Sequence, residues 1–138
     1  MKKNLSSVFS VLSLLIFISC GDGAGEDSIV WHDESKGIKA WERVTQNGVT
    51  TVSMYHTNGQ KKCIEEYKGN VKHGTCTRWY ENGKIEAETK YENGIKVGNH
   101  KRFYDNGQLS LEKFFNDDSK TEKWALYFPN GQVWKTDN

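Results

Sequence analysis

Alternating apolar and charged residues in the second half of the chain predict short β-strands. Beyond the Asn82-Gly83 pair, one set of alternate positions is apolar: Ile85, Ala87 and Tyr91. The positions between them are charged: Glu86, Glu88 and Lys90. One face of an extended strand collects each set, whereas helical spacing would mix them. A later segment repeats the apolar set as Leu109, Leu111 and Phe115, so the pattern predicts at least two equivalent strands.

The strands belong to a tandem repeat with a 24-residue period. Its clearest mark is an Asn-Gly pair, found at Asn58-Gly59, Asn82-Gly83, Asn106-Gly107 and Asn130-Gly131. An aromatic residue stands three positions before each Asn: Tyr55, Trp79, Phe103 and Tyr127. A second aromatic residue stands nine positions after the first three: Tyr67, Tyr91 and Phe115. These coincidences place a repeat domain at residues 55–138.

Each repeat is predicted to be one β-hairpin closed by its Asn-Gly pair. Asn-Gly favours the two-residue type I′ turn, because both central residues of that turn have positive φ. With such a turn, Tyr80 would face Ile85, and Arg78 would face Ala87. The links between hairpins are longer and more variable. The sequence therefore predicts an all-β protein, an elongated antiparallel meander of 24-residue hairpins.

Residues 30–54 are predicted to form a degenerate unit that caps the array. Asn47-Gly48 offers a turn there, but it lies one residue out of the 24-residue register. Terminal units of repeat arrays are commonly atypical, because one of their sides has no neighbour.

The first 19 residues have the layout of a bacterial secretory signal. Two lysines precede a mostly apolar stretch, Val8–Ile18, which is too short for a comfortable membrane span. The following Phe17-Ile18-Ser19-Cys20 resembles a lipobox, in which the cysteine is lipidated and becomes the new N-terminus. Phe17 stands where that motif usually has Leu. An ordinary cleaved signal or an uncleaved anchor is the alternative interpretation.

Residues 20–29 are predicted to be a flexible tether, since they are rich in Gly and acidic residues. Acyl chains on Cys20 would hold the folded part near a bilayer. Gly21 follows the cysteine where an Asp would favour retention in the inner membrane. We therefore expect a lipid-anchored protein of the cell envelope, placed at the outer membrane.

Charge and composition argue against nucleic-acid binding. Without Lys2 and Lys3 the mature chain keeps 17 basic residues against 18 acidic ones, a net charge of −1. Nucleic-acid binding usually requires a basic patch or stripe. The chain also has one Pro, 13 Gly and many aromatic residues, which favours a β-rich protein with a thin core.

No motif in the sequence indicates an enzyme, a metal site or a cofactor. The four histidines, His32, His56, His73 and His100, are scattered, and none has metal-ligand spacing to a Cys or a carboxylate. Nucleophile-elbow and phosphate-loop motifs are missing. We therefore expect a non-enzymatic protein that needs no cofactor.

Cys63 and Cys76 are predicted to lie on neighbouring strands. Symmetric closure of the intervening link would place Cys63 opposite Arg78, two residues away from Cys76. Export would permit a disulfide bond. A disulfide and a pair of buried free thiols both remain open at this point.

The aromatic residues are the best candidates for a binding face. Trp79, Phe103 and Tyr127 would form a ladder on one face, with Arg78 and Arg102 among its charged neighbours. One interpretation is cross-strand stacking that stiffens the sheet. The other is a stripe that binds a protein or a glycan, since extended exposed apolar area often marks a site.

The recurring Tyr/Phe-x-x-Asn-Gly with its second aromatic resembles the bacterial MORN-variant repeat over residues 55–134. Proteins with this repeat are often grouped as YwqK-like antitoxins. The resemblance implies an elongated, curved antiparallel sheet used for binding. Export of this chain departs from a cytoplasmic antitoxin.

Two functions follow as hypotheses. In the first, a membrane-anchored lipoprotein uses its repeat sheet as a protein-binding module of antitoxin or immunity type. In the second, the chain is a structural envelope protein or a surface lipoprotein that binds glycan or lipid head groups.

Overall fold

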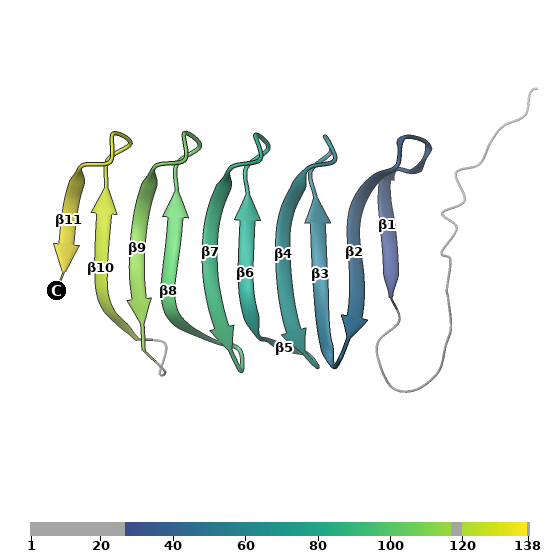
Figure 1. Ribbon diagram of the computed structural model, residues 1–138, viewed down its shortest axis with the longest axis horizontal. Helices are drawn as coiled ribbons and strands as arrows, with labels where there is room; N and C mark the ends of the chain where they lie inside the picture. Colours follow the sequence, from purple (N-terminus) through teal and green to yellow (C-terminus); the bar gives the residue numbers. More distant parts are fainter. Residues whose placement is uncertain (1–26, 117–119, 138) are drawn as a thin grey trace, which may run out of the picture.

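The computed structural model describes residues 27–116 and 120–137. The predicted signal segment, Cys20 and most of the predicted tether lie outside these residues. The described chain forms one open sheet of eleven strands, drawn as a single row in Figure 1. The strands are β1 (Ser28–Asp33), β2 (Ile38–Gln46), β3 (Val49–Tyr55), β4 (Lys61–Lys68), β5 (Val71–Lys72), β6 (Gly74–Trp79), β7 (Ile85–Glu92), β8 (Ile95–Phe103), β9 (Leu109–Phe115), β10 (Thr121–Tyr127) and β11 (Val133–Asp137).

The sheet confirms the predicted antiparallel meander. Apart from β5, every strand pairs with the strands before and after it in the sequence. The short β5 pairs with β4 inside the link to β6. A single turn of 3₁₀-helix, η1 (Glu34–Lys36), connects β1 to β2. No helix in the described part of the chain has the length and apolar character needed to cross a membrane.

Strand register follows the 24-residue period. Each hairpin of the repeat has one equivalent pair beside its turn: Tyr55↔Lys61, Trp79↔Ile85, Phe103↔Leu109 and Tyr127↔Val133. Arg78 lies opposite Ala87, as predicted. A β-bulge follows, however, so Ile85 pairs with Trp79 rather than with Tyr80. Tyr80 instead belongs to the turn.

The predicted type I′ geometry of the repeated Asn-Gly turns is wrong. In the second hairpin, Gly83 N–H donates to the Tyr80 carbonyl oxygen at 3.0 Å, and Tyr80 N–H donates to the Lys84 carbonyl oxygen at 2.9 Å. Gly83 has φ of +80°, but Asn82 is not among the non-glycine residues with positive φ in the described chain. This is a three-residue loop with a left-handed glycine. The β-bulge lies beside it, where Glu86 is left without a partner between the pairs Trp79↔Ile85 and Arg78↔Ala87.

Type I′ geometry fits instead the two Asn-Gly pairs outside the repeat register. Asn47 and Gly48 have φ of +52° and +76°, and they join Gln46 to its partner Val49. Asn93 and Gly94 have φ of +49° and +81°, in the link from β7 to β8. Two-residue Asn-Gly loops thus join β2 to β3 and β7 to β8.

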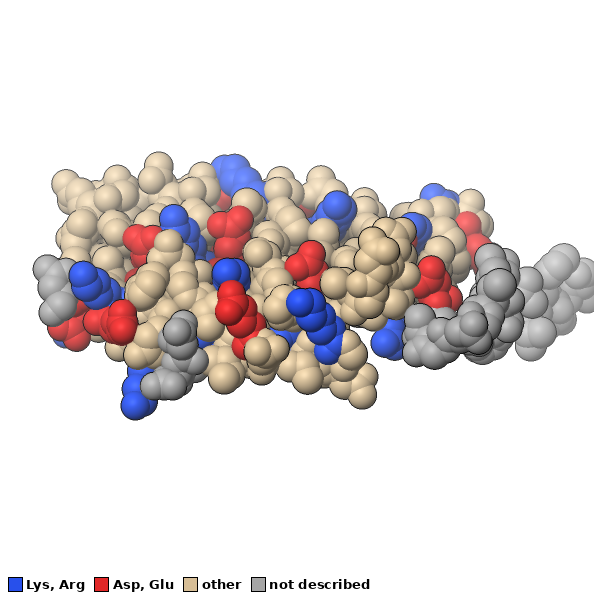
Figure 2. All heavy atoms as spheres, turned by 60° about the horizontal axis from the view of Figure 1, so that its bottom comes forward, with Lys and Arg blue, Asp and Glu red and all other residues tan. Residues whose placement is uncertain are grey.

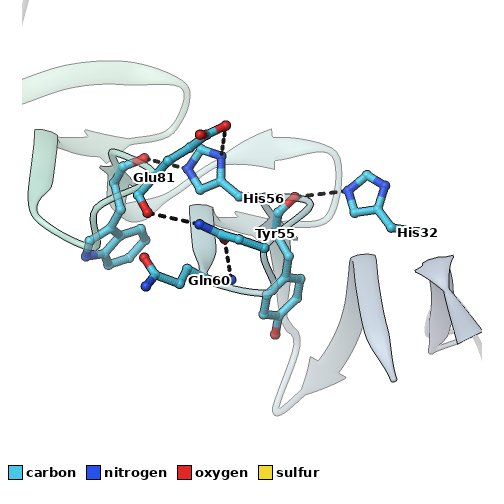
Figure 3. A network of polar contacts seen from close by, with 7 residues as sticks. His32, Tyr55, His56, Gln60 and Glu81 are labelled. Carbon is cyan, nitrogen blue, oxygen red and sulfur yellow. Dashed lines mark hydrogen bonds and ion pairs between the residues drawn. The ribbon is translucent and has the colours of Figure 1, made fainter. Parts of the chain in front are cut away.

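Hydrogen bonds between residues 23 positions apart hold consecutive turns together. In the repeated turns, the residue after the first aromatic bonds to the carbonyl oxygen of the next unit's first aromatic. His32, in β1 and 24 positions before His56, makes the same kind of bond. The paired residues are His32 and Tyr55 at 3.2 Å, His56 and Trp79 at 2.9 Å, Tyr80 and Phe103 at 2.8 Å, and Tyr104 and Tyr127 at 2.8 Å. Figure 3 shows the first two of these contacts, with the Glu81 carboxylate 3.8 Å from His56 Nδ1.

The repeated asparagines form a second row of contacts between turns. Asn82 Oδ1 accepts the Lys84 N–H at 3.0 Å, and Asn82 Nδ2 donates to the Asp105 carbonyl oxygen at 3.0 Å. Asn58 and Asn106 make the same two kinds of bond. These three asparagines therefore each shape their own turn and bind the following one. This arrangement explains why the period is so regular.

The core is thin because the sheet has one layer. Among the described residues, the buried hydrophobic ones are Cys63 and Val97, whereas Thr50, Ser53, Glu65 and Thr89 are buried polar ones. With so little apolar surface buried, ladder hydrogen bonds, cross-strand side-chain pairs and contacts between turns must supply much of the stability.

Candidate binding face

Paired residues of an antiparallel sheet share a face, so the register defines a continuous row of side chains. From β4 to β9 this row is Cys63, Arg78, Ala87, Arg102 and Leu111. We call the side of the sheet that carries it the arginine face. Arg78 and Arg102 are exposed, and they stand on either side of the small residue Ala87.

A hollow of about 330 Å³ opens on the arginine face over β6, β7 and β8. Ala87 and Thr89 of β7 line it, between longer side chains from the neighbouring strands. The other lining residues are Glu65, Lys72, Cys76, Arg78, Glu86, Tyr91, Lys96, His100 and Arg102. Short side chains on the central strand therefore leave a space with polar and charged walls.

Cations outnumber carboxylates around the hollow. The hollow is lined by four cationic side chains, Lys72, Arg78, Lys96 and Arg102, and by two carboxylates, Glu65 and Glu86. Burial lowers the pKa of His100, and the neighbouring Lys96 and Arg102 lower it further, so this imidazole is neutral at pH 7. The His100 Nδ1 atom lies 2.7 Å from the Thr89 hydroxyl. The local excess of positive charge suits an anionic group.

Over the whole chain the charges nearly balance, with 19 basic and 18 acidic residues. Figure 2 shows one side of the molecule, on which basic and acidic side chains are interspersed among neutral ones. Such mixing agrees with the near-neutral composition.

Lysine side chains cover the second aromatic residues of the repeats. Lys72 Nζ lies 6.0 Å from the centre of the Tyr67 ring and 5.6 Å from that of Tyr91. Lys96 Nζ lies 5.7 Å from the centre of the Phe115 ring. These are cation–π distances, and they hold the lysine stems against the sheet beside the hollow.

A cluster of polar contacts surrounds Glu65 at one end of the hollow. The Glu65 carboxylate accepts hydrogen bonds from the Tyr67 hydroxyl at 2.5 Å and from Lys72 Nζ at 2.7 Å. Burial alone would raise the pKa of Glu65, but these two donors outweigh it and hold the pKa below its usual value. Glu65 is therefore a buried, ionised carboxylate with strong partners.

Cys63 and Cys76 adjoin this cluster as free thiols. Cys63 lies opposite Arg78, the register that symmetric closure of the link predicted. Cys76 Sγ lies 3.8 Å from Glu65 Oε1. The hydrogen bond from Cys76 and the proximity of Arg78 lower the pKa of Cys63 to about 7, whereas the same bond raises the pKa of Cys76.

The structure separates the residues predicted to share a binding face. Arg78 and Arg102 both line the hollow. Trp79, Phe103 and Tyr127 are half-buried at the ends of β6, β8 and β10, and they do not line it. Their carbonyl oxygens accept the bonds between turns. Their role in binding stays a prediction.

Sequence reasoning missed several residues of the hollow, although the period marked some of them. Lys72 and Lys96 are separated by one period of the repeat, as are Arg78 and Arg102. A search for repeated charges would have added Lys72 and Lys96 to Arg78 and Arg102, which the sequence had already singled out. Glu65, Cys76 and His100 carry no such mark, because they occur in single repeats.

Comparisons with known proteins agree with the repeat. Residues 72–93 and 96–117 each match the family model of the MORN repeat variant. The starting points of these two segments are separated by one period of the sheet. No curated protein matches the chain.

One solved structure, "Crystal Structure of TarM", is similar to the chain with a TM-score of 0.39 and 13% sequence identity. The similarity covers 88% of this chain and 21% of that chain, so the present chain spans about a fifth of its length. A likeness this weak carries no argument about function. The two family matches and the register of the strands support a protein built from MORN-variant repeats.

Proposed function

We propose that this chain is an exported lipoprotein, anchored through Cys20, whose arginine face binds an acidic surface of a partner protein in the cell envelope. The role is of antitoxin or immunity type, in line with the resemblance to YwqK-like proteins. The observation that carries the proposal is the hollow between Arg78 and Arg102, in which four cations face two carboxylates.

Repeats of the MORN type generally serve as modules that bind proteins or lipids. A protein partner fits this hollow better than a membrane surface does. Glu65 and Glu86 line it together with the cations, and they would repel an extended sheet of phosphates. A single Asp or Glu side chain of a partner can instead lie between Arg78 and Arg102, where bidentate contacts are available.

The anchor is tested by labelling cells with a radioactive palmitate. The wild-type chain should incorporate the label and sediment with the envelope, whereas Cys20→Ala should do neither. Labelling that persists in Cys20→Ala would refute the anchor but leave the binding proposal standing.

The partner is tested by cross-linking in intact cells, followed by identification of the linked protein and titration of both purified proteins. Arg102→Glu should weaken binding at least tenfold, about 1.4 kcal/mol, because it places a negative charge opposite an acidic partner. Lys123→Glu is the matched control, since Lys123 is exposed and one residue out of phase with the arginine face.

Equal losses of affinity in Arg102→Glu and Lys123→Glu would show that the partner does not bind at the hollow. The double variant Trp79→Ala/Phe103→Ala tests the predicted aromatic ladder in the same titration. Vesicles with anionic lipids and envelope glycans serve as competing ligands. Binding to either of them, without a protein partner, would support the alternative of a surface lipoprotein that binds head groups or glycans.

A further inference from the structure

Three potential metal ligands meet beside the hollow. The Sγ atoms of Cys63 and Cys76 and a carboxylate oxygen of Glu65 all lie within 4.8 Å of one another. Cys63 and Glu65 alternate along β4, so both lie on the arginine face. Cys76 joins them from β6, beyond the link that contains β5.

The spacing of these donors suits a tetrahedral metal better than a disulfide bond. Cys63 lies opposite Arg78, so Cys76 is its diagonal neighbour. Diagonal neighbours have Cβ atoms about 7 Å apart, whereas a disulfide needs about 4 Å. Two sulfur ligands of one zinc ion lie about 3.8 Å apart, because each Zn–S bond is about 2.3 Å. The distance of 3.8 Å from Cys76 Sγ to Glu65 Oε1 is close to a ligand–ligand spacing as well.

The surroundings hold the donors in place. The Tyr67 hydroxyl and Lys72 Nζ fix the Glu65 carboxylate, as outer partners commonly fix a metal-binding carboxylate. Arg78 lies across from Cys63. Cys63 is buried, and both Glu65 and Cys76 line the hollow, which gives a cation access from solvent.

We propose that Cys63, Glu65 and Cys76 bind a thiophilic divalent cation, with Zn²⁺ as the fitting ion, and that the fourth ligand comes from the hollow. Binding releases the proton of each thiol that is still protonated, while the ionised carboxylate binds as it stands. The cation would link β4 to β6 where the short β5 interrupts their connection, and it would stabilise the sheet by mass action.

The test uses the purified full chain, reduced, with Cys20→Ser so that two thiols remain. Titration with Co²⁺ alone should give sulfur-to-metal charge-transfer absorption and the intense visible bands of a tetrahedral site. Zn²⁺ should displace Co²⁺ at one ion per chain. X-ray absorption of the Zn²⁺-loaded chain should show two sulfur ligands together with oxygen or nitrogen ligands.

Cys76→Ser and Glu65→Gln should each weaken Zn²⁺ binding at least tenfold. Glu66→Gln is the matched control. Glu66 follows Glu65 in the sequence, but its carboxylate accepts a hydrogen bond from the Thr75 N–H and lies outside the cluster of three ligands. Circular dichroism of every variant separates lost ligands from lost folding. The X-ray absorption measurement uses the chain with all three ligands in place. It therefore tests the proposal even if a ligand variant does not fold.

The proposal would be overturned if Co²⁺ gave no charge-transfer absorption, or if Cys76→Ser bound Zn²⁺ with unchanged affinity. A chain that forms a Cys63–Cys76 disulfide in air and takes up no Zn²⁺ after reduction would also overturn it. Neither result would bear on the binding of a partner at Arg102, which the titration described above measures separately.

Discussion

The Tyr80 hydroxyl donates a hydrogen bond to the backbone carbonyl oxygen of Phe103 over 2.8 Å, and the two residues are 23 positions apart in the sequence. Tyr104 makes the same bond to Tyr127. Earlier in the chain, His32 at the end of β1 and His56 take the place of tyrosine. One side-chain position of the repeat thus connects each turn to the next along the whole edge of the sheet.

Replacing Tyr80 by Phe should lower the free energy of unfolding by about 1 kcal/mol, since it removes this hydrogen bond and keeps the ring. Urea unfolding followed by circular dichroism measures the change. Tyr91→Phe is the control, because the Tyr91 hydroxyl makes no hydrogen bond to the described residues. Equal effects in the two variants would mean that the bond between turns contributes no stability.

Asn82→Asp should cost more stability than Asn130→Asp. Both variants keep the oxygen that accepts the N–H two residues later. Asn82→Asp also loses the donor to the Asp105 carbonyl oxygen, whereas the Asn130 amide donates only within its own turn, to Gln132 at 3.3 Å. We expect a difference of about 1 kcal/mol in thermal or urea unfolding. A smaller loss for Asn82→Asp would contradict the proposed role of the asparagine row.

Gly74→Ala should destabilise the chain more than Gly98→Ala. Both glycines have positive φ, +79° and +64°, so Ala costs about 1 kcal/mol of backbone strain at either position. At Gly74 the new Cβ would also lie 1.8 Å from Glu66 Oε2, whereas at Gly98 it meets no atom within 4 Å. Repeating the comparison with Glu66→Ala should remove the difference, as a double-mutant cycle would show. A difference that persists would exclude the clash as its cause.

The pair of Glu42 and Tyr55 should make stability depend on pH at both ends of the range. Burial alone would raise the pKa of Glu42, but hydrogen bonds from Lys39 and Tyr55 outweigh it and hold the pKa below its usual value. This stabilisation is present above the unfolded pKa of about 4.5 and is lost as pH falls through the folded pKa. Burial and the bond to Glu42 raise the pKa of Tyr55 to about 12.

The Tyr55 contribution is complete below pH of about 10 and is lost as pH rises towards 12. Urea unfolding across the pH range should therefore show a loss at each end. Tyr55→Phe should flatten the alkaline end and weaken the acid end, while Glu42→Gln should flatten the acid end. An unchanged profile in Glu42→Gln would show that this carboxylate does not govern the acid limb.

The sequence by itself determined the period, the strand content and the antiparallel order. These follow from local chemistry: residues such as Ile85 and Ala87 alternate with charges, and each Asn-Gly pair reverses the chain within a few residues. Even the pairing of Arg78 with Ala87 could be predicted, because a hairpin fixes the register beside its turn. The same reasoning missed the third loop residue and the β-bulge at Glu86.

Only the tertiary structure decided the turn geometry and the composition of the candidate sites. The Asn82 amide reaches the next turn, so the loop conformation depends on a neighbour 23 positions away. The hollow forms because Ala87 and Thr89 are short where β6 and β8 carry long cations, a relation across three strands. Cys63, Glu65 and Cys76 come together across β4 and β6, with Cys63 and Cys76 on a diagonal. Such a diagonal contact depends on strand register and sheet twist together. The spacing of the residues along the chain does not reveal it.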